Sequence, residues 1–157
     1  MLRFALTDIP YLIPPNRYLL PNPQYLIFAK KIMQALLVIH NLLRWLIIIF
    51  GLWTVITAIS GLSGKREFTP SDGRSNFLFM LCMDIQLLVG LGLYFSGVWF
   101  DQLNHLGDAM KDANLRFFTM EHELMMIIAW ILVHVGRVMV KKAPLSSAKF
   151  KKSLLFL

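Results

Sequence analysis

The amino-acid sequence predicts an all-α fold: a polytopic membrane helix bundle with three transmembrane helices and a truncated or short fourth. Of the 157 residues, 57% are hydrophobic and 16% are charged, whereas an average soluble domain is about 45–50% apolar and about 25% charged. A single domain of this length cannot bury so many apolar side chains in its own core, so much of the apolar surface is expected to face lipid. The charges are also unevenly spread, because three long stretches carry almost none.

Residues 1–32 differ from the rest of the chain because they contain five of its seven prolines. Pro10, Pro14 and Pro15 interrupt any apolar run, so neither a membrane helix nor a signal peptide is expected there. We expect a Pro-rich extension that is disordered or lies at the membrane interface. If the biological start is Met33, residues 1–32 would not be part of the natural protein.

Three transmembrane spans are expected at about residues 33–62, 76–100 and 117–140, within one helical bundle over residues 33–142. Each is long enough for a bilayer, which about 20 apolar residues cross. Arg44 is the only charged residue of the first span, and Asp84 is the only one of the second. Charged residues and histidines interrupt the third span, but its centre is uncharged.

The connecting segments and the tail predict how the bundle is oriented. Both connections, residues 63–75 and 101–116, are short, and the second is expected to hold a brief interfacial helix. Residues 143–157 form a basic tail that predicts the start of a fourth helix. Outside the spans, eight lysines and arginines lie on the side of the first loop and the tail, against six on the other. The positive-inside rule therefore places the first loop and the tail in the cytoplasm. This accounts for the basic excess without a nucleic-acid partner.

Two histidines, His40 and His122, lie at matched depth in the first and third spans. They fall about 13 and 9 Å inside their helices at 1.5 Å per residue, and the two spans run parallel. First and third helices of an up-and-down bundle are diagonal neighbours, so a planar cofactor with two axial imidazoles would fill the gap between them. We expect haem b, with its iron bound by both histidines; structural hydrogen bonding is the alternative. Small residues on the histidine faces would admit either a macrocycle or a neighbouring helix: Gly51, Ala58, Ala129 and Gly136.

Other polar side chains inside the spans are candidate site residues because ionisable groups are costly in lipid. Arg44 is expected to neutralise a haem propionate or to form an ion pair with Asp84, and we favour the ion pair. Glu121 and Glu123 lie at the start of the third helix, where the helix dipole stabilises negative charge. The functional alternative is that one of them contacts His122. The buried polar residues expected are Asp84, Gln86, Glu121 and His134. Alternative axial ligands near His122 are Met120, Met125 and Met126.

Three motifs carry a family resemblance: His40-Asn-Leu-Leu-Arg44-Trp45, the stretch 84–95, and Arg116-Phe-Phe-Thr-Met-Glu121-His122. Over about residues 33–142, the chain resembles small bacterial membrane proteins labelled cytochrome b, found notably in the Bacteroidetes. The resemblance implies a four-helix membrane fold, haem binding and a place in the bacterial inner membrane. It carries over as site positions His40, Arg44, Asp84, Gln86, Glu121 and His122. The chain departs from that family in its 32 additional N-terminal residues and in ending at Leu157, where a fourth helix would begin.

These features predict an electron-transfer or accessory protein rather than a stand-alone enzyme. We expect a b-type cytochrome-like protein that passes electrons between a membrane quinone and a respiratory-chain or other membrane subunit. Without a fourth helix, a partner subunit or a second copy would have to close the site. The alternative is a cofactor-free membrane scaffold or accessory subunit of a larger complex. A third hypothesis is a transporter or proton path, with Asp84 and His134 as relay groups.

Overall fold

The computed structural model describes residues 23–97 and 99–156, and every regular element within these ranges is a helix. Three helical stretches are long and apolar enough to cross a membrane: residues 24–63, 70–96 and 113–142. The prediction of an all-α fold is therefore confirmed, with three candidate membrane spans in the expected order.

The two longest helices form an antiparallel pair, α1 (Pro23–Ser63) and α2 (Pro70–Ser96). The second connection holds three short helices, η2 (Asp101–His105), α3 (Leu106–Ala109) and α4 (Ala113–Arg116). A π-helical turn, η3 (Phe117–Glu121), leads into α5 (His122–Lys142). The chain then turns back into α6 (Ser146–Phe156), where the start of a fourth helix was expected.

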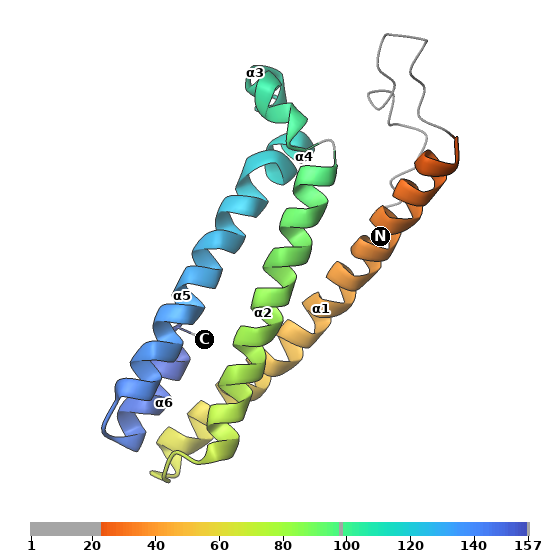
Figure 1. The fold of residues 1–157 in the computed structure, drawn as a ribbon. Helices are drawn as coiled ribbons and strands as arrows, with labels where there is room; N and C mark the ends of the chain where they lie inside the picture. The colour runs from red at the N-terminus through yellow and green to blue at the C-terminus, as the bar shows by residue number, and fades with distance from the viewer. Residues whose placement is uncertain (1–22, 98, 157) are drawn as a thin grey trace.

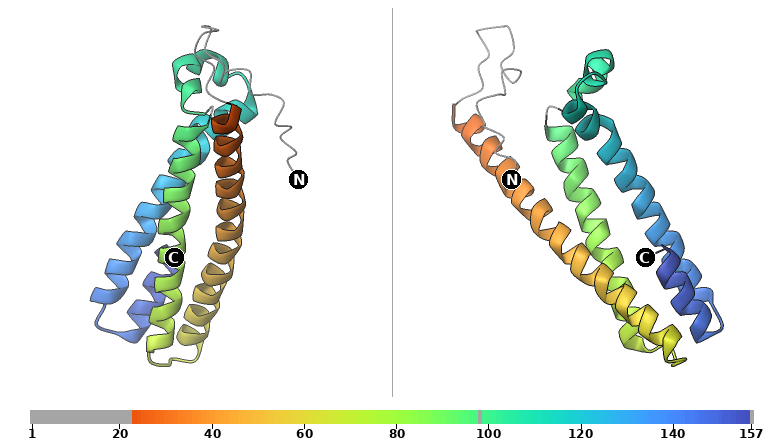
Figure 2. Two further views of the ribbon diagram at one scale, coloured as in Figure 1. Left: turned by 45° about the vertical axis from the view of Figure 1, so that its right-hand side comes forward. Right: turned by 180° about the vertical axis from the view of Figure 1, so that it is seen from behind.

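Helix α2 lies at the centre of the arrangement, because it packs against both α1 and α5. On the other side α6 packs against the same two helices, so α1 and α5 occupy diagonal positions (Figure 1). Seen from behind, α1 leans away from the other helices toward its N-terminal end (Figure 2, right). The diagonal relation of the first and third long helices, which the histidine argument requires, is therefore present.

Helix α1 begins earlier than predicted, at Pro23 instead of residue 33. The expected N-terminal extension is thus wrong for residues 23–32, which are helical, while residues 1–22 lie outside the described part of the chain. Pro23 is the last proline before the apolar run. Because proline fits the first turn of a helix, where its missing N–H costs nothing, it can start α1 without interrupting it.

Helix α2 also begins earlier than predicted, at Pro70, because its start is built from capping residues. The backbone N–H of Thr69 donates to the Asp72 carboxylate at 2.8 Å, the return contact expected of a capping box. Arg66 pairs with the same carboxylate at 2.7 Å and also donates to the backbone oxygen of Thr57 at 3.2 Å. The first loop is thereby tied to both helices that it connects.

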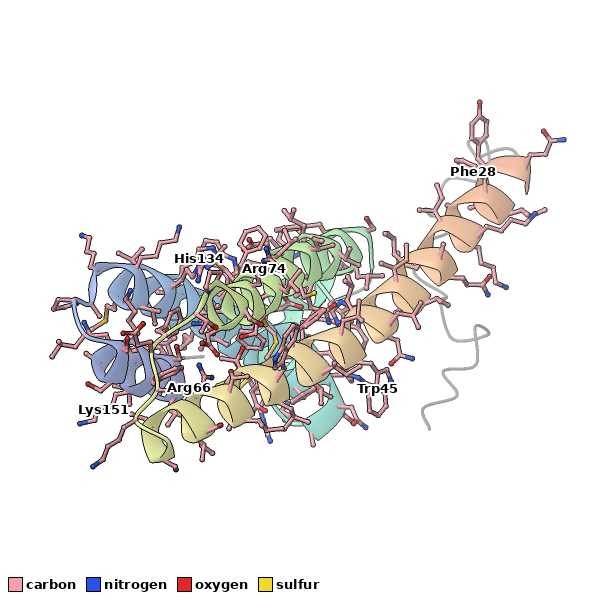
Figure 3. All side chains as sticks on the ribbon, turned by 90° about the horizontal axis from the view of Figure 1, so that it is seen from below. Phe28, Trp45, Arg66, Arg74, His134 and Lys151 are labelled. Atoms are coloured by element: carbon pink, nitrogen blue, oxygen red, sulfur yellow. The ribbon has the colours of Figure 1, made fainter. Side chains whose placement is uncertain are left out.

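Helix α6 is held in place by close packing on small residues and by one buried polar pair. The ring of Phe150 lies against Gly61 of α1, and Phe156 lies against Gly136 of α5. The Asn76 amide of α2 donates to the hydroxyl of Ser153 at 2.9 Å. Arg66 lies between the ends of α1 and α6 (Figure 3), 4.8 Å from the ring centre of Phe150. Gly61 and Gly136 therefore serve helix packing.

The packing of α6 gives a stability prediction. Gly61→Ala would place a methyl group against the Phe150 ring, which is 1% exposed, and overpacking of this kind costs about 1–3 kcal/mol. The matched control is Gly92→Ala, because nothing lies within 4 Å of a methyl group there. We expect it to be neutral or stabilising by up to about 1 kcal/mol. Unfolding in SDS followed by circular dichroism compares the two, and equal stabilities would contradict the α6 packing.

Candidate functional site

The structure brings His40 of α1 and His122 of α5 together across the diagonal of the bundle. Their ring centroids lie 6.3 Å apart, with 69° between the ring planes. Both side chains are half-buried. Two imidazoles that are 82 positions apart in the chain therefore share one site.

Helix α2 positions the ring of His40. Nε2 of His40 lies 3.2 Å from Nε2 of Gln86, and the ring rests on Gly90, where a methyl group would come within 3.4 Å of Cε1. Nδ1 of His40 and Oε1 of Gln86 are both buried with no hydrogen-bond partner among the described residues. A Gln amide can present either its nitrogen or its oxygen. With Oε1 turned toward Nε2, the amide would accept the ring N–H and leave the lone pair of Nδ1 free for a metal, as in other histidine-ligated sites.

A small cavity lies between the two histidines. Its volume is about 20 Å³, and Met83, Gln86, Glu123 and Met126 help to line it. A cavity of this size has room for about one water molecule. The donor atoms are therefore assembled, but flexible apolar side chains fill the space around them.

The π-helical turn before His122 sets the direction of that side chain. In a π-helix one more residue is accommodated per hydrogen-bonded turn, which rotates everything that follows. The ring of His122 then lies 5.6 Å from that of Phe117 and 6.3 Å from that of Phe118, measured between centroids. The backbone oxygen of Thr119 inside this turn accepts a hydrogen bond from the hydroxyl of Tyr94 at 2.9 Å. The turn is thus fixed to α2.

A second polar cluster joins α2 to α5, two residues before Gln86 on α2 and eight to twelve residues after His122 on α5. The indole N–H of Trp130 donates to the Asp84 carboxylate at 2.6 Å, and Nε2 of His134 lies 3.2 Å from the same oxygen. Nδ1 of His134 is 2.9 Å from the backbone oxygen of Trp130. The structure therefore brings together Asp84 and His134, the two residues of the proton-path hypothesis.

The favoured ion pair between Arg44 and Asp84 is wrong. Arg44 is exposed, donates to the Asn41 side chain at 2.7 Å and lies 5.7 Å from the ring of Trp45, whose side chain lies on the outer side of α1 (Figure 3). Two groups from α5 already satisfy Asp84. An arginine near a membrane interface can extend toward water instead of seeking a buried partner.

The histidine pair lies far from the end of the bundle that holds the first loop. Gly90, which supports His40, is 20 residues (70 to 90) from the start of α2, and His122 is 20 residues (122 to 142) from the end of α5. Both distances correspond to about 30 Å of helix. This is also the thickness of a hydrocarbon core, so in a bilayer the pair would lie near the opposite interface rather than deep within it.

Some of the remaining predicted site residues are exposed, whereas others line the histidine cavity. Glu121 is exposed and pairs with Arg116 at 2.7 Å, so its prediction as a buried polar residue is wrong. Glu123 is half-buried and lines the histidine cavity, and it has no hydrogen bond or ion pair with any described residue. His105 is exposed, as are two of the three methionines, Met120 and Met125, whereas Met126 lines the cavity.

Sequence reasoning missed Trp130 and Tyr94 as polar partners. Trp130 is four residues before His134, so the helical repeat puts both on one face, and this spacing could have indicated a shared acceptor. Tyr94 lies near the end of the second span and is 8% exposed. Its partner is a backbone oxygen inside a π-turn. The residue types in this segment do not indicate that a π-turn forms there.

Comparisons with protein-family models, curated proteins and solved structures find no match to this chain. The resemblance to small cytochrome b proteins stays a prediction, and the function is argued from the site itself.

The Asp84 cluster gives a second stability prediction. Trp130→Phe keeps the ring but removes the N–H that reaches Asp84, and loss of a hydrogen bond to a charged, half-buried group costs about 1–3 kcal/mol. Trp45→Phe is the matched control, because Trp45 is 55% exposed; surface substitutions change stability by about 0.5 kcal/mol or less. Unfolding in SDS, again followed by circular dichroism, measures both. A Trp130→Phe protein as stable as the control would show that the contact contributes nothing.

Proposed function

We propose that this chain is a haem-binding electron carrier of the b-type cytochrome class, with His40 and His122 as axial ligands. The observation that carries the proposal is the 6.3 Å between the two ring centroids. An imidazole nitrogen binds a transition metal at about 2 Å and lies about 1 Å from its ring centre, so two axial imidazoles on one metal have centres about 6 Å apart. The spacing therefore suits one metal bound from both sides.

The residues present fit haem in donor type and spacing. The space around them would have to widen before a macrocycle could enter. The cavity of about 20 Å³ is far smaller than a macrocycle, so Met83, Leu87 and Met126 would have to turn outward. Methionine side chains are unbranched and adapt readily. On the side of α2, Gly90 presents no side chain to the site. Binding would therefore rearrange side chains around an imidazole pair whose spacing is already suitable.

The roles of the protein groups follow from their contacts. Haem would supply one-electron chemistry and, with two nitrogen ligands, leave no open position for a substrate. His40 and His122 would hold the iron, and Gln86 would orient the ring of His40. Arg44 is one helical turn from His40, so it remains the proposed partner of a propionate, provided that its contact with Asn41 is exchanged.

A second candidate is a cofactor-free scaffold or accessory subunit of a larger membrane complex. It is favoured by the interhelical pairing of the buried polar groups. Gln86 bonds His40, Trp130 bonds Asp84, and Tyr94 bonds the backbone of Thr119, each across two helices. Such contacts hold membrane helices together without any cofactor.

Haem binding separates the two candidates. Full-length protein produced with ample haem and purified in detergent should give a reduced-minus-oxidised spectrum with Soret and alpha bands. We expect His40→Ala and His122→Ala each to abolish the bis-histidine spectrum, because either change removes one axial ligand. His105→Ala is the matched control, since His105 is exposed in η2, and it should retain the bands. Absence of the bands in the unchanged protein would refute the electron-carrier proposal and leave the scaffold.

We also propose the orientation given by the basic residues, with the first loop and α6 at the cytoplasmic side of a bacterial inner membrane. Cys82 is buried and is the only cysteine, so Cys82→Ala provides a background for single cysteines at Ser71 and Asn114, both exposed. An impermeant maleimide should label the Asn114→Cys protein in intact spheroplasts and the Ser71→Cys protein only after permeabilisation. The reverse pattern would invert the topology.

A further inference from the structure

Arg137 of α5 is a cation inside a candidate membrane span that has no partner. Its side chain is half-buried, and it forms no hydrogen bond or ion pair with any described residue. The inner nitrogen, Nε, packs against the protein and is buried, whereas the terminal nitrogens Nη1 and Nη2 remain accessible. The guanidinium is therefore held by its inner edge, and the N–H groups of its outer edge have no acceptor from the described chain.

Arg137 lies at the end of the bundle that holds the first loop and α6. Five residues separate it from Lys142, the last residue of α5, which corresponds to about 8 Å of helix. From this depth an arginine side chain can extend to the level of the lipid phosphates. Because an unpaired guanidinium is costly in hydrocarbon, an anion at that level would stabilise it.

Two further cations lie close to the same level. Lys141 is one helical turn after Arg137, so it falls on the same face of α5, and it is exposed. Arg74 of α2 is also exposed and lies on the same side of the molecule as His134 (Figure 3). Since α2 and α5 run antiparallel and Asp84 contacts His134, Arg74, ten residues before Asp84, comes level with the end of α5. We call Arg137, Lys141 and Arg74 the Arg137 site.

The chain supplies no carboxylate to neutralise the Arg137 site. Among the described residues, Glu67 and Asp72 are the acidic ones at this end of the bundle. Asp72 already pairs with Arg66, and Glu67 is exposed in the first loop. No ion pair of the described residues includes a member of the Arg137 site. The three cations are therefore left for an anion from outside the chain.

Exposed apolar side chains continue from the Arg137 site toward the middle of the bundle. Phe77 and Leu81 follow Arg74 at intervals of three and seven residues, so they share its face of α2. They are 43% and 38% exposed, and Val138, next to Arg137, is 49% exposed. Cations at the end of a helix pair, with an apolar surface beside them, suit a phospholipid head group and its acyl chain.

We propose that the Arg137 site binds the phosphodiester group of an anionic glycerophospholipid. The outer edge of the Arg137 guanidinium donates to two phosphate oxygens, the bidentate arrangement that arginine forms with phosphate. Lys141 and Arg74 attract the negative charge from either side. An acyl chain lies along Phe77 and Leu81. A soluble phosphate ion would meet the same cations but would gain nothing from the apolar surface.

The test measures lipid binding to the full-length protein in detergent by native mass spectrometry. Dioleoyl phosphatidylglycerol is compared with dioleoyl phosphatidylcholine, which has the same acyl chains but carries its own cation beside the phosphate. We expect at least about tenfold tighter binding of phosphatidylglycerol, the ratio that one charge-assisted hydrogen bond gives. Equal affinities would overturn the proposal without any variant having to fold.

Inorganic phosphate distinguishes a lipid from a soluble anion as the ligand. Added in large excess over the lipid, it should leave phosphatidylglycerol bound, because the acyl chain contributes to binding. Displacement of the lipid by inorganic phosphate would identify a soluble anion as the ligand and overturn the lipid proposal.

Protein variants then locate the site. Arg137→Gln should weaken phosphatidylglycerol binding about tenfold and leave phosphatidylcholine binding unchanged. Lys151→Gln is the matched control, because it removes the same charge from an exposed residue of α6, on the α6 side of the bundle and away from Arg74 (Figure 3). Unchanged affinity in the Arg137→Gln protein would overturn the assignment. Equal weakening by both changes would show a diffuse attraction to the basic end of the bundle and would also overturn it.

The double variant His40→Ala/His122→Ala separates this proposal from the haem proposal. Arg137 lies 15 residues after His122 on α5, about 22 Å along the helix, so phosphatidylglycerol binding should persist in this variant. Loss of binding would contradict a site at the far end of the bundle. Selective lipid binding in a protein that shows no haem spectrum would retain the Arg137 site and remove only the electron-carrier proposal.

Discussion

Lipid offers no hydrogen bonds, so a polar side chain within a membrane span depends on a partner from a neighbouring helix. In this chain α2 provides most of these partners. Gln86 reaches α1, and Asp84 and Tyr94 reach α5 and the π-turn before it. The position of α1 relative to α5, and with it the distance between the two histidines, follows from how each is bound to α2 and packed on α6. The candidate site therefore depends on α2, although neither histidine belongs to it.

The fold could be predicted largely from hydropathy, because an uninterrupted apolar run of sufficient length has few alternatives to a helix. Helix boundaries were less predictable, since they depend on local chemistry. Pro23 lies in the stretch predicted as an extension and Pro70 lies in the predicted first loop, yet each begins a helix. At Pro70, the preceding Thr69 and following Asp72 were a usable signal. Only the context after a proline distinguishes a helix start from a break.

The site was predictable to the extent that it follows from depth and helical repeat. Equal depth of His40 and His122 was enough to expect them near one another. The partner of Asp84 was not predictable, because charge alone pointed to Arg44, whereas the structure satisfies the carboxylate with an indole N–H and an imidazole. Neither of those groups carries a permanent charge. Exposure of Glu121 and partial burial of Glu123 likewise depend on helix rotation, which a π-turn changes.

The π-turn from Phe117 to Glu121 also bears on how this chain should be aligned with others. Such a turn contains one residue more than the α-helix it replaces, so the helix after it is advanced by one position relative to an uninterrupted helix. A homologous chain without the turn would carry the equivalent of His122 one position earlier after its Arg116. Residue-for-residue matching through the segment from Arg116 to His122 would then pair the histidine with the neighbouring position of the helix instead of with its equivalent. A one-residue gap between these positions would restore the correspondence, and its presence in an alignment would mark the turn.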